Sequence, residues 1–333
     1  MLLNNRAADC REIGRGYLKK LLTMYDTILM ALTQEQAGGA DMIAAANSLE
    51  RAIEHKPVGG GIVSYTGFLG NLKIWLDAYN FKIISGSLCK WFLDENYQTM
   101  SRGDVERAIE RLSDLLHLPM KGATVTRADF GRVFIMQHPT AVYFNYLGML
   151  SRYHRLEEPS GLYYTQRDER LCFYDKNREQ RDKGSTPPAL YCDKNVLRYE
   201  QRYLRRLHNR WGEVTAARLY DENFYISLYN RWVNSYRSID KLNNIQINFE
   251  NMKGVKDMDK RCRLLFIERA GGLPNALAII DADRAAGKIT SKQAFEMKKA
   301  LKEACKYSGG IAEENEAIAE LDKKMNEAAR FYR

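Results

Sequence analysis

The sequence lacks the signatures of several large protein classes. Its cysteines are scattered, and no two of them form a C-x-x-C pair; they are Cys10, Cys89, Cys172, Cys192, Cys262 and Cys305. We therefore expect reduced thiols in a cytosolic protein rather than a disulfide framework. No apolar run approaches the roughly 18 residues that a membrane helix needs, and no secretory signal pattern opens the chain.

A phosphate-binding loop of the nucleotide-hydrolase type is also missing. The glycine run Gly59, Gly60, Gly61 lacks the G-x-x-x-x-G-K-[ST] spacing that lets backbone amides surround a nucleotide phosphate. The segment 86–90 is too short for that role. We interpret the glycine run as a turn.

Positive charge is what the chain has in excess. Its 333 residues carry a net charge of +9, with a pI near 9.1, and 45% of them are hydrophobic, enough for a sizeable core. Such a balance favours a polyanionic partner, either nucleic acid or an acidic membrane surface. The 20 tyrosines suit a single-strand binder, in which aromatic rings stack on bases, or they belong to the core.

Short runs of strand-forming residues between glycine and asparagine turns predict a sheet. The expected strands are residues 24–32, 62–65, 72–76, 81–85, a strand around 127–129, 141–147, a hairpin of 161–166 with 171–176, and a strand from 195. The expected helices are 40–54, 101–118, 203–210, 215–242, 260–269, 274–286, 291–307 and 311–332.

This order predicts an α+β fold, with a largely antiparallel sheet faced by helices and an all-helical C-terminal region. We expect three parts: an N-terminal extension at 1–23 that carries no function, one domain at 24–245, and the helical region at 250–333. Met24 is a plausible natural start, which would make the extension an upstream artefact.

The stretch 196–207 is the most informative part of the chain. In an extended backbone Arg198, Glu200 and Arg202 share one face, because alternate residues point to the same side. Such a strip is either a surface ion pair or part of a site that handles anions. Two other strand-like stretches also place a carboxylate beside a base: Arg127 with Asp129, and Asp175 with Lys176.

Two helical patterns accompany this strand. Arg202, Arg206 and Arg210 recur every four residues, which predicts one positive helix edge suited to the DNA backbone or simply a solvated face. On the long helix 215–242, four aromatic residues fall on one face, which indicates a packing face for most of them; they are Tyr225, Tyr229, Trp232 and Tyr236.

A series of short motifs resembles the replication initiation proteins of filamentous phages and related plasmids, the gene-two/gene-ten family. The motifs are Tyr25-Asp-Thr-Ile28, Gly86-Ser-Leu-Cys-Lys90, Asp104-Val-Glu-Arg-Ala-Ile109, Val125-Thr-Arg-Ala-Asp129, Phe173-Tyr-Asp-Lys176 and Leu197-Arg-Tyr-Glu-Gln-Arg202. The resemblance covers about residues 24–242, and a weaker similarity extends to rolling-circle initiators of small Gram-positive plasmids. It implies a rolling-circle initiator or relaxase-like fold in a bacterial host cytoplasm.

The resemblance also implies a chemistry. Such proteins nick single-stranded or locally melted origin DNA with a tyrosine that stays linked to the 5′ phosphate and frees a 3′-OH. Among the helical tyrosines, Tyr236 matches the family position best and Tyr229 is the second choice. We expect a divalent cation, Mg²⁺ or Mn²⁺, to neutralise the scissile phosphate.

Hard cations prefer carboxylate oxygens, so Asp129 and Glu200 are the expected ligands, with Asp175 third. Arg127, Lys176 and Arg198 are expected to hold phosphates beside the ion, and the positive helix edge to bind DNA. The His-hydrophobic-His metal motif of many rolling-circle nucleases is absent.

Two alternatives stay open on sequence alone. One is a conjugative or mobilisation relaxase, which uses the same chemistry at an origin of transfer. The other is a non-catalytic origin-binding protein on the same scaffold. A host helicase and a second copy of the chain are further possible partners.

Overall fold

The computed structural model describes residues 23–330, except 243, 246–253, 307–311 and 314. The predicted extension 1–23 lies outside these residues apart from Thr23. The five cysteines that the structure describes are all free thiols. Among the described residues, no helix is both long enough and apolar enough to cross a membrane.

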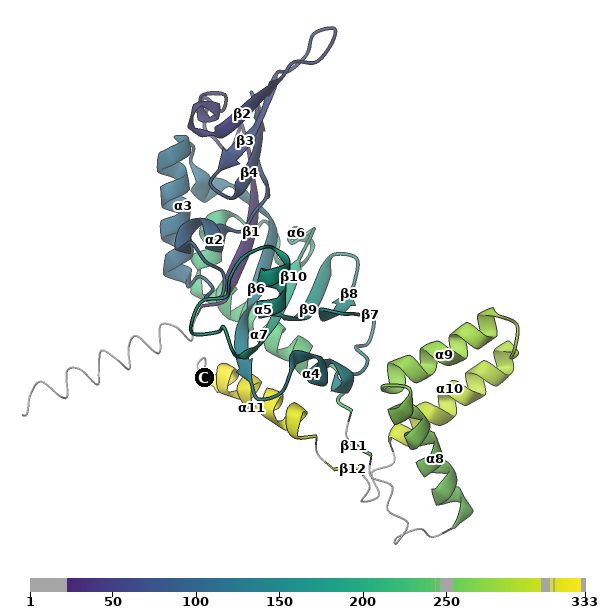
Figure 1. Cartoon of the computed structure of the whole chain (residues 1–333). Helices are drawn as coiled ribbons and strands as arrows, with labels where there is room; N and C mark the ends of the chain where they lie inside the picture. Colours follow the sequence, from purple (N-terminus) through teal and green to yellow (C-terminus); the bar gives the residue numbers. More distant parts are fainter. Residues whose placement is uncertain (1–22, 243, 246–253, 307–311, 314, 331–333) are drawn as a thin grey trace, which may run out of the picture.

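Ten strands form one antiparallel sheet in the order β2-β3-β4-β5-β1-β6-β10-β9-β8-β7 (Figure 1). They are β1 (Tyr25–Thr33), β2 (Glu50–His55), β3 (Ser64–Leu69), β4 (Leu72–Asp77), β5 (Asn80–Ser85), β6 (Thr124–Met136), β7 (His154–Glu158), β8 (Gly161–Thr165), β9 (Glu169–Asp175) and β10 (Asn195–Tyr203). The strands β1, β6 and β10 lie at the centre. The predicted hairpin is confirmed as β8 and β9.

Helices accompany the sheet and continue beyond it, so the predicted α+β class is confirmed. The helices before residue 240 are η1 (Ala44–Ser48), α2 (Leu88–Leu93), α3 (Arg102–Leu116), η2 (Met120–Gly122), α4 (Thr140–Tyr146), α5 (Lys176–Asp182), α6 (His208–Trp211), η3 (Ala216–Tyr220) and α7 (Glu222–Arg237). The later elements are β11 (Asn244–Ile245), α8 (Val255–Arg269), α9 (Leu273–Ala285), α10 (Ser291–Cys305), β12 (Ala312–Glu313) and α11 (Glu316–Arg330).

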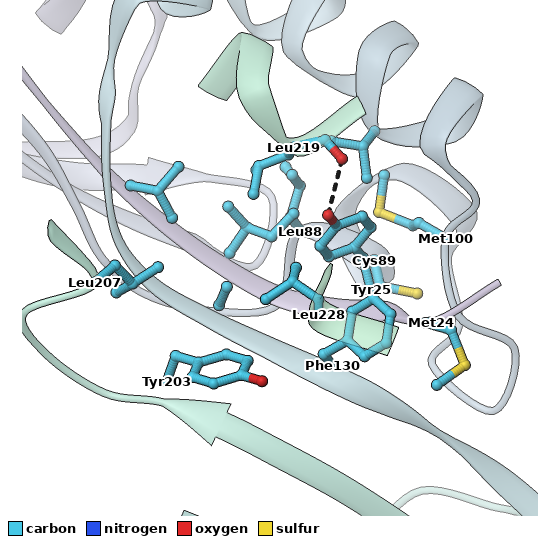
Figure 2. Close-up of a cluster of buried hydrophobic side chains, with 14 of the residues drawn as sticks. Met24, Tyr25, Leu88, Cys89, Met100, Phe130, Tyr203, Leu207, Leu219 and Leu228 are labelled. Carbon is cyan, nitrogen blue, oxygen red and sulfur yellow. Dashed lines mark hydrogen bonds between the residues drawn. The ribbon is translucent and has the colours of Figure 1, made fainter. Parts of the chain in front are cut away.

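One face of the sheet is covered by helices. Tyr25 points from β1 into this layer, where its ring packs against Phe130 and Tyr225 and its hydroxyl donates to the carbonyl of Leu219 in η3 at 2.8 Å (Figure 2). Tyr199 of β10 lies in the same layer and stacks on Trp232 of α7. We call this the helix-covered face. We call the opposite side the open face, because solvent reaches it over β3, β4 and β5, although the segment around Asn96 covers it at Arg198 of β10.

Several predicted elements were wrong in type or extent. Residues 141–146 belong to helix α4, and Leu147 is its C-cap, because the buried residues Thr140, Tyr143, Phe144 and Leu147 follow a helical period. The predicted helix 40–54 is a short 3-10 turn followed by strand β2. The long helix is confined to α7, which begins at the N-cap Asp221.

The predicted basic helix 203–210 does not form. Strand β10 continues to Tyr203, which pairs with Ala128 and Glu169 in the neighbouring strands, and only the four-residue α6 follows. Arg202 therefore lies in a strand, Arg206 in the connection and Arg210 in α6. The three arginines do not make one helix edge.

The C-terminal helices divide between two cores. Helices α8, α9 and α10 share a second hydrophobic core, whereas α11 packs into the first core beside α4 and β6 (Figure 1). Tyr143, Tyr229 and Tyr236 donate their hydroxyls to Glu320, the carbonyl of Ala328 and Asp322 of α11. The domain boundary near residues 245–250 stays a prediction.

Strands β6 and β10 approach closely at one glycine. Gly131 is the cross-strand partner of Glu200. A Cβ atom added at Gly131 would overlap the carbonyl of Tyr199 and the Cβ of Glu200. The absence of a side chain there leaves the Glu200 side chain room on the open face.

We expect Gly131→Ala to lower the free energy of unfolding by about 1–3 kcal/mol, because the added methyl group must push β10 aside. The matched control is Gly103→Ala near the start of α3, where the nearest atom to a new Cβ is the Arg107 guanidinium at 3.5 Å. The control should raise stability by up to about 1 kcal/mol. Urea unfolding measures both, and equal effects of the two changes would contradict the close approach.

Candidate functional site

An unbroken series of alternating charges crosses the centre of the open face. It runs Asp26, Arg198, Glu200, Arg202, Asp129, Arg127, and we call these six residues the charge ladder. Its members come from β1, β10 and β6, which are adjacent strands. Residues distant in sequence thus meet because alternate side chains of neighbouring strands share a face.

The contacts within the ladder are short. Arg198 donates to Asp26 at 2.8 Å and to Glu200 at 3.3 Å. Arg202 donates through Nε to Glu200 at 2.7 Å, and the same nitrogen lies 3.8 Å from Asp129. Arg127 binds both oxygens of Asp129, at 2.8 and 2.6 Å.

The ladder is sealed at one end and accessible at the other. The side chains of Arg198 and Glu200 are 0% and 2% exposed, whereas those of Arg202 and Arg127 are 25% and 30% exposed. Arg198 also donates to the backbone carbonyl of Asn96. A ligand from solvent can therefore reach the Arg202 and Arg127 end.

Burial affects the two central carboxylates differently. Burial and the negative charge of Glu200 together raise the pKa of Asp129 to about 6, because they outweigh the opposing effect of the hydrogen bonds from Arg127. Burial also acts on Glu200, but the guanidiniums of Arg202 and Arg198 on either side lower its pKa to about 2. Of these two carboxylates, Glu200 therefore holds its negative charge more firmly, and Asp129 accepts a proton first.

The expected ligands Asp129 and Glu200 do lie together, on one face of neighbouring strands. Asp175, the third expected ligand, does not join them. It is the cross-strand partner of Leu197, so it belongs to the other parity of β9, and it caps α5 by accepting from the amide of Arg178. The third carboxylate of the ladder is Asp26 instead.

Sequence reasoning gave Asp26 no role, although it stands in the Tyr25-Asp-Thr-Ile28 motif. The signal was a lone carboxylate in an otherwise apolar strand, and such a charge is buried only when it is paired. Asp26 is 5% exposed and is bonded to Arg198 and to the hydroxyl of Ser87.

The residues that were expected to contact phosphate also lie apart from one another. Lys176 is fully buried and pairs with Glu179. Arg210 of α6 pairs with the buried Glu169 of β9, and Arg231 of α7 pairs with the same carboxylate. Glu169 thus joins α6 and α7 to the sheet. Arg206 lies in the exposed connection after β10 and lines a shallow pocket of about 520 Å³.

The prediction that a phenol of the long helix reaches the two carboxylates was wrong. The ring of Tyr236 packs against Tyr199, whose side chain points away from its neighbours Arg198 and Glu200 in β10. Its hydroxyl donates to Asp322 of α11 at 2.5 Å. Tyr229 is in the same layer, and the sheet separates both from the ladder.

Two other tyrosines share the open face with the ladder. Tyr174 of β9 is the cross-strand partner of Arg198, and the Arg202 guanidinium lies 6.0 Å from its ring centre. Tyr163 of β8 is the partner of Cys172, which in turn partners Glu200. Tyr174 is buried, and Tyr163 is partly exposed.

The ladder alone does not make a closed metal site. Within the part of the chain that the structure describes, no three His, Cys, Asp or Glu side chains are grouped to hold a metal ion. All four oxygens of Asp129 and Glu200 accept from guanidiniums. The two carboxylates fit a Mg²⁺-like ion only if water and a ligand phosphate complete its shell, as is usual for Mg²⁺.

Comparison with protein families gives this geometry a context. The family described as the N-terminal part of the replication-associated gene-two protein matches residues 24–233, which is more than half of the chain and includes the whole ladder. A comparison with curated proteins finds no match. The matched segment begins just before β1 and ends within α7. The chain belongs to this family of phage replication-associated proteins, and the resemblance that its short motifs indicated is confirmed.

Proposed function

We propose that the chain initiates replication by cutting one DNA strand at an origin, through a tyrosine that becomes linked to the 5′ phosphate. The observation that carries the proposal is the charge ladder: carboxylates and guanidiniums meet on one sheet face, two of the guanidiniums are accessible, and the buried Tyr174 lies beside them on the same face. Those groups suit phosphodiester chemistry, in which charge must be neutralised and a nucleophile positioned.

Tyr174 is the nucleophile that this geometry supports, in place of Tyr236. Its oxygen forms a bond to phosphorus as the bond to the 3′ oxygen breaks; the phenol loses a proton and the departing oxygen gains one. Burial and then Glu200 raise the pKa of Tyr174 well above its ordinary value, whereas Arg198 and Arg202 lower it. Neutralising Glu200 would therefore favour ionisation.

The arginines at the accessible end supply phosphate contacts. Arg127 and Arg202 are partly exposed and can turn from the carboxylates to the oxygens of a phosphodiester. Asp129 and Glu200 then fit a divalent cation together with that phosphate and water. When bound, Mg²⁺ or Mn²⁺ would neutralise the scissile phosphate and both carboxylates.

One observation favours a second candidate, a non-catalytic origin-binding protein. The guanidiniums already satisfy every oxygen of Asp129 and Glu200, as a purely structural ion-pair network would. A relaxase would use the same chemistry at an origin of transfer, but the family match favours replication.

We expect Tyr174→Phe to abolish the covalent protein–DNA adduct. The measurement is a denaturing gel after incubation with Mn²⁺ and labelled single-stranded DNA tiling the replicon that encodes the protein. Tyr236→Phe is the matched control and should retain the adduct, because its hydroxyl lies on the helix-covered face. Loss of the adduct in Tyr236→Phe with retention in Tyr174→Phe would reverse the assignment.

We expect Asp129→Asn and Glu200→Gln each to lower adduct formation by about 100-fold or more, because each removes a charge that faces the cation. Electron paramagnetic resonance of Mn²⁺ titrated in the presence of DNA should show weaker metal binding in both variants. Asp175→Asn, outside the ladder, is the control that keeps both properties. Wild-type Mn²⁺ binding in the two ladder variants would contradict the metal assignment and support the non-catalytic candidate.

A further inference from the structure

The open face continues from the ladder into the N-terminal half of the sheet. Cross-strand partners form one row through β2, β3, β4, β5 and β1: Ile53, Thr66, Trp75, Lys82 and Ala31. Every residue of this row is partly or fully exposed. The adjacent row of opposite parity includes Leu76, Phe81 and Leu32, all 0% exposed.

This alternation shows that one side of β4, β5 and residues 29–32 of β1 is buried and that the other side faces solvent. Lys73 and Ile84 extend the open side along β4 and β5, and both are exposed. Polar and apolar side chains alternate on this surface and do not form a continuous apolar patch. This argues against a helix or a second sheet that packs over it.

The chemistry of the surface is that of a nucleic-acid contact. The ammonium of Lys82 lies over the ring of Trp75, 5.1 Å from its centre, so a cation and an aromatic ring stand together on this surface. Strands β3 and β5 contain no acidic residue, and β4 contains only Asp77. Asp77 is occupied by the backbone amides of Tyr79 and Asn80.

The surface is also continuous with the candidate cleavage site. Leu29 of β1 is the cross-strand partner of Arg127, and Ala31, two residues further along β1, is the partner of Lys82. A DNA strand that leaves the Arg127 end of the ladder along the open face would therefore reach Lys82 and Trp75 next.

We propose that the open face of β3, β4 and β5 binds the single-stranded DNA that flanks the cleaved phosphodiester, with Trp75 stacking on a base and Lys82 contacting a phosphate. The inference rests on the proposed function, because it extends the DNA beyond the ladder. Stacking on an aromatic ring suits any base, so this contact strengthens binding without reading sequence. It assigns the N-terminal half of the sheet a role in holding substrate.

The test uses the full chain and a fluorescein-labelled oligothymidylate of about 30 nucleotides, followed by anisotropy across a salt series. Trp75→Ala should weaken binding about ten- to a hundredfold, the loss of one stacked base. Trp75→Phe should retain most of the affinity because it keeps an aromatic face. Lys82→Ala should lower the slope of log affinity against log salt by about one.

Lys121→Ala is the matched charge control, since Lys121 is an exposed lysine that pairs with Glu110 of α3 away from the open face, and it should leave the salt slope unchanged. Circular dichroism confirms that each variant is folded.

The possible failures are distinguishable. A wild-type adduct together with unchanged oligothymidylate binding by Trp75→Ala and Lys82→Ala overturns the inference alone. No wild-type adduct on any DNA overturns the proposed function, whatever the Trp75 variants do. A dimer in sedimentation that Trp75→Ala dissociates, without a change in DNA affinity, assigns the face to a second copy of the chain and also overturns the inference.

Discussion

The structure depends on the pairing of buried charges across its three central strands. Arg198 and Glu200 are almost completely inaccessible, and an unpaired charge in that position would cost several kcal/mol. Each carboxylate of the ladder contacts at least one guanidinium, so β1, β6 and β10 can carry ionic groups in the middle of a folded sheet. The same arrangement leaves two arginines at an accessible end, where a phosphate can compete for them.

The two faces of the sheet differ in what they carry: the packed aromatic core lies on one face and the candidate site on the other. Aromatic residues from β10 and α7 fill the helix-covered face, and there the hydroxyls of Tyr236 and Tyr229 donate to α11. The open face has half-exposed residues over β4, β5 and the later part of β1, whereas the ladder residues Asp26, Arg198 and Glu200 are buried and depend on their ion pairs. Helix α11 belongs to the first core, although α8, α9 and α10, which precede it in the chain, form the second core.

Sequence patterns were sufficient for the parts of the site that depend on strand alternation. The shared face of Arg198, Glu200 and Arg202, and the proximity of Asp129, follow from a period of two in neighbouring strands. The face on which α7 packs does not follow from its own period, so Tyr236 was assigned to the wrong side. Its aromatic stripe did indicate burial, and that interpretation is confirmed. Asp26 required knowledge of which strand lies beside β6.

The central claim is that a tyrosine on the open face, beside the ladder, attacks the phosphodiester. Mass spectrometry of the tryptic peptide that carries DNA after the reaction tests it most directly. The account predicts that the DNA is attached to the peptide of residues 171–176, whose single tyrosine is Tyr174. Attachment to the peptide of residues 232–237, which contains Tyr236, would contradict it.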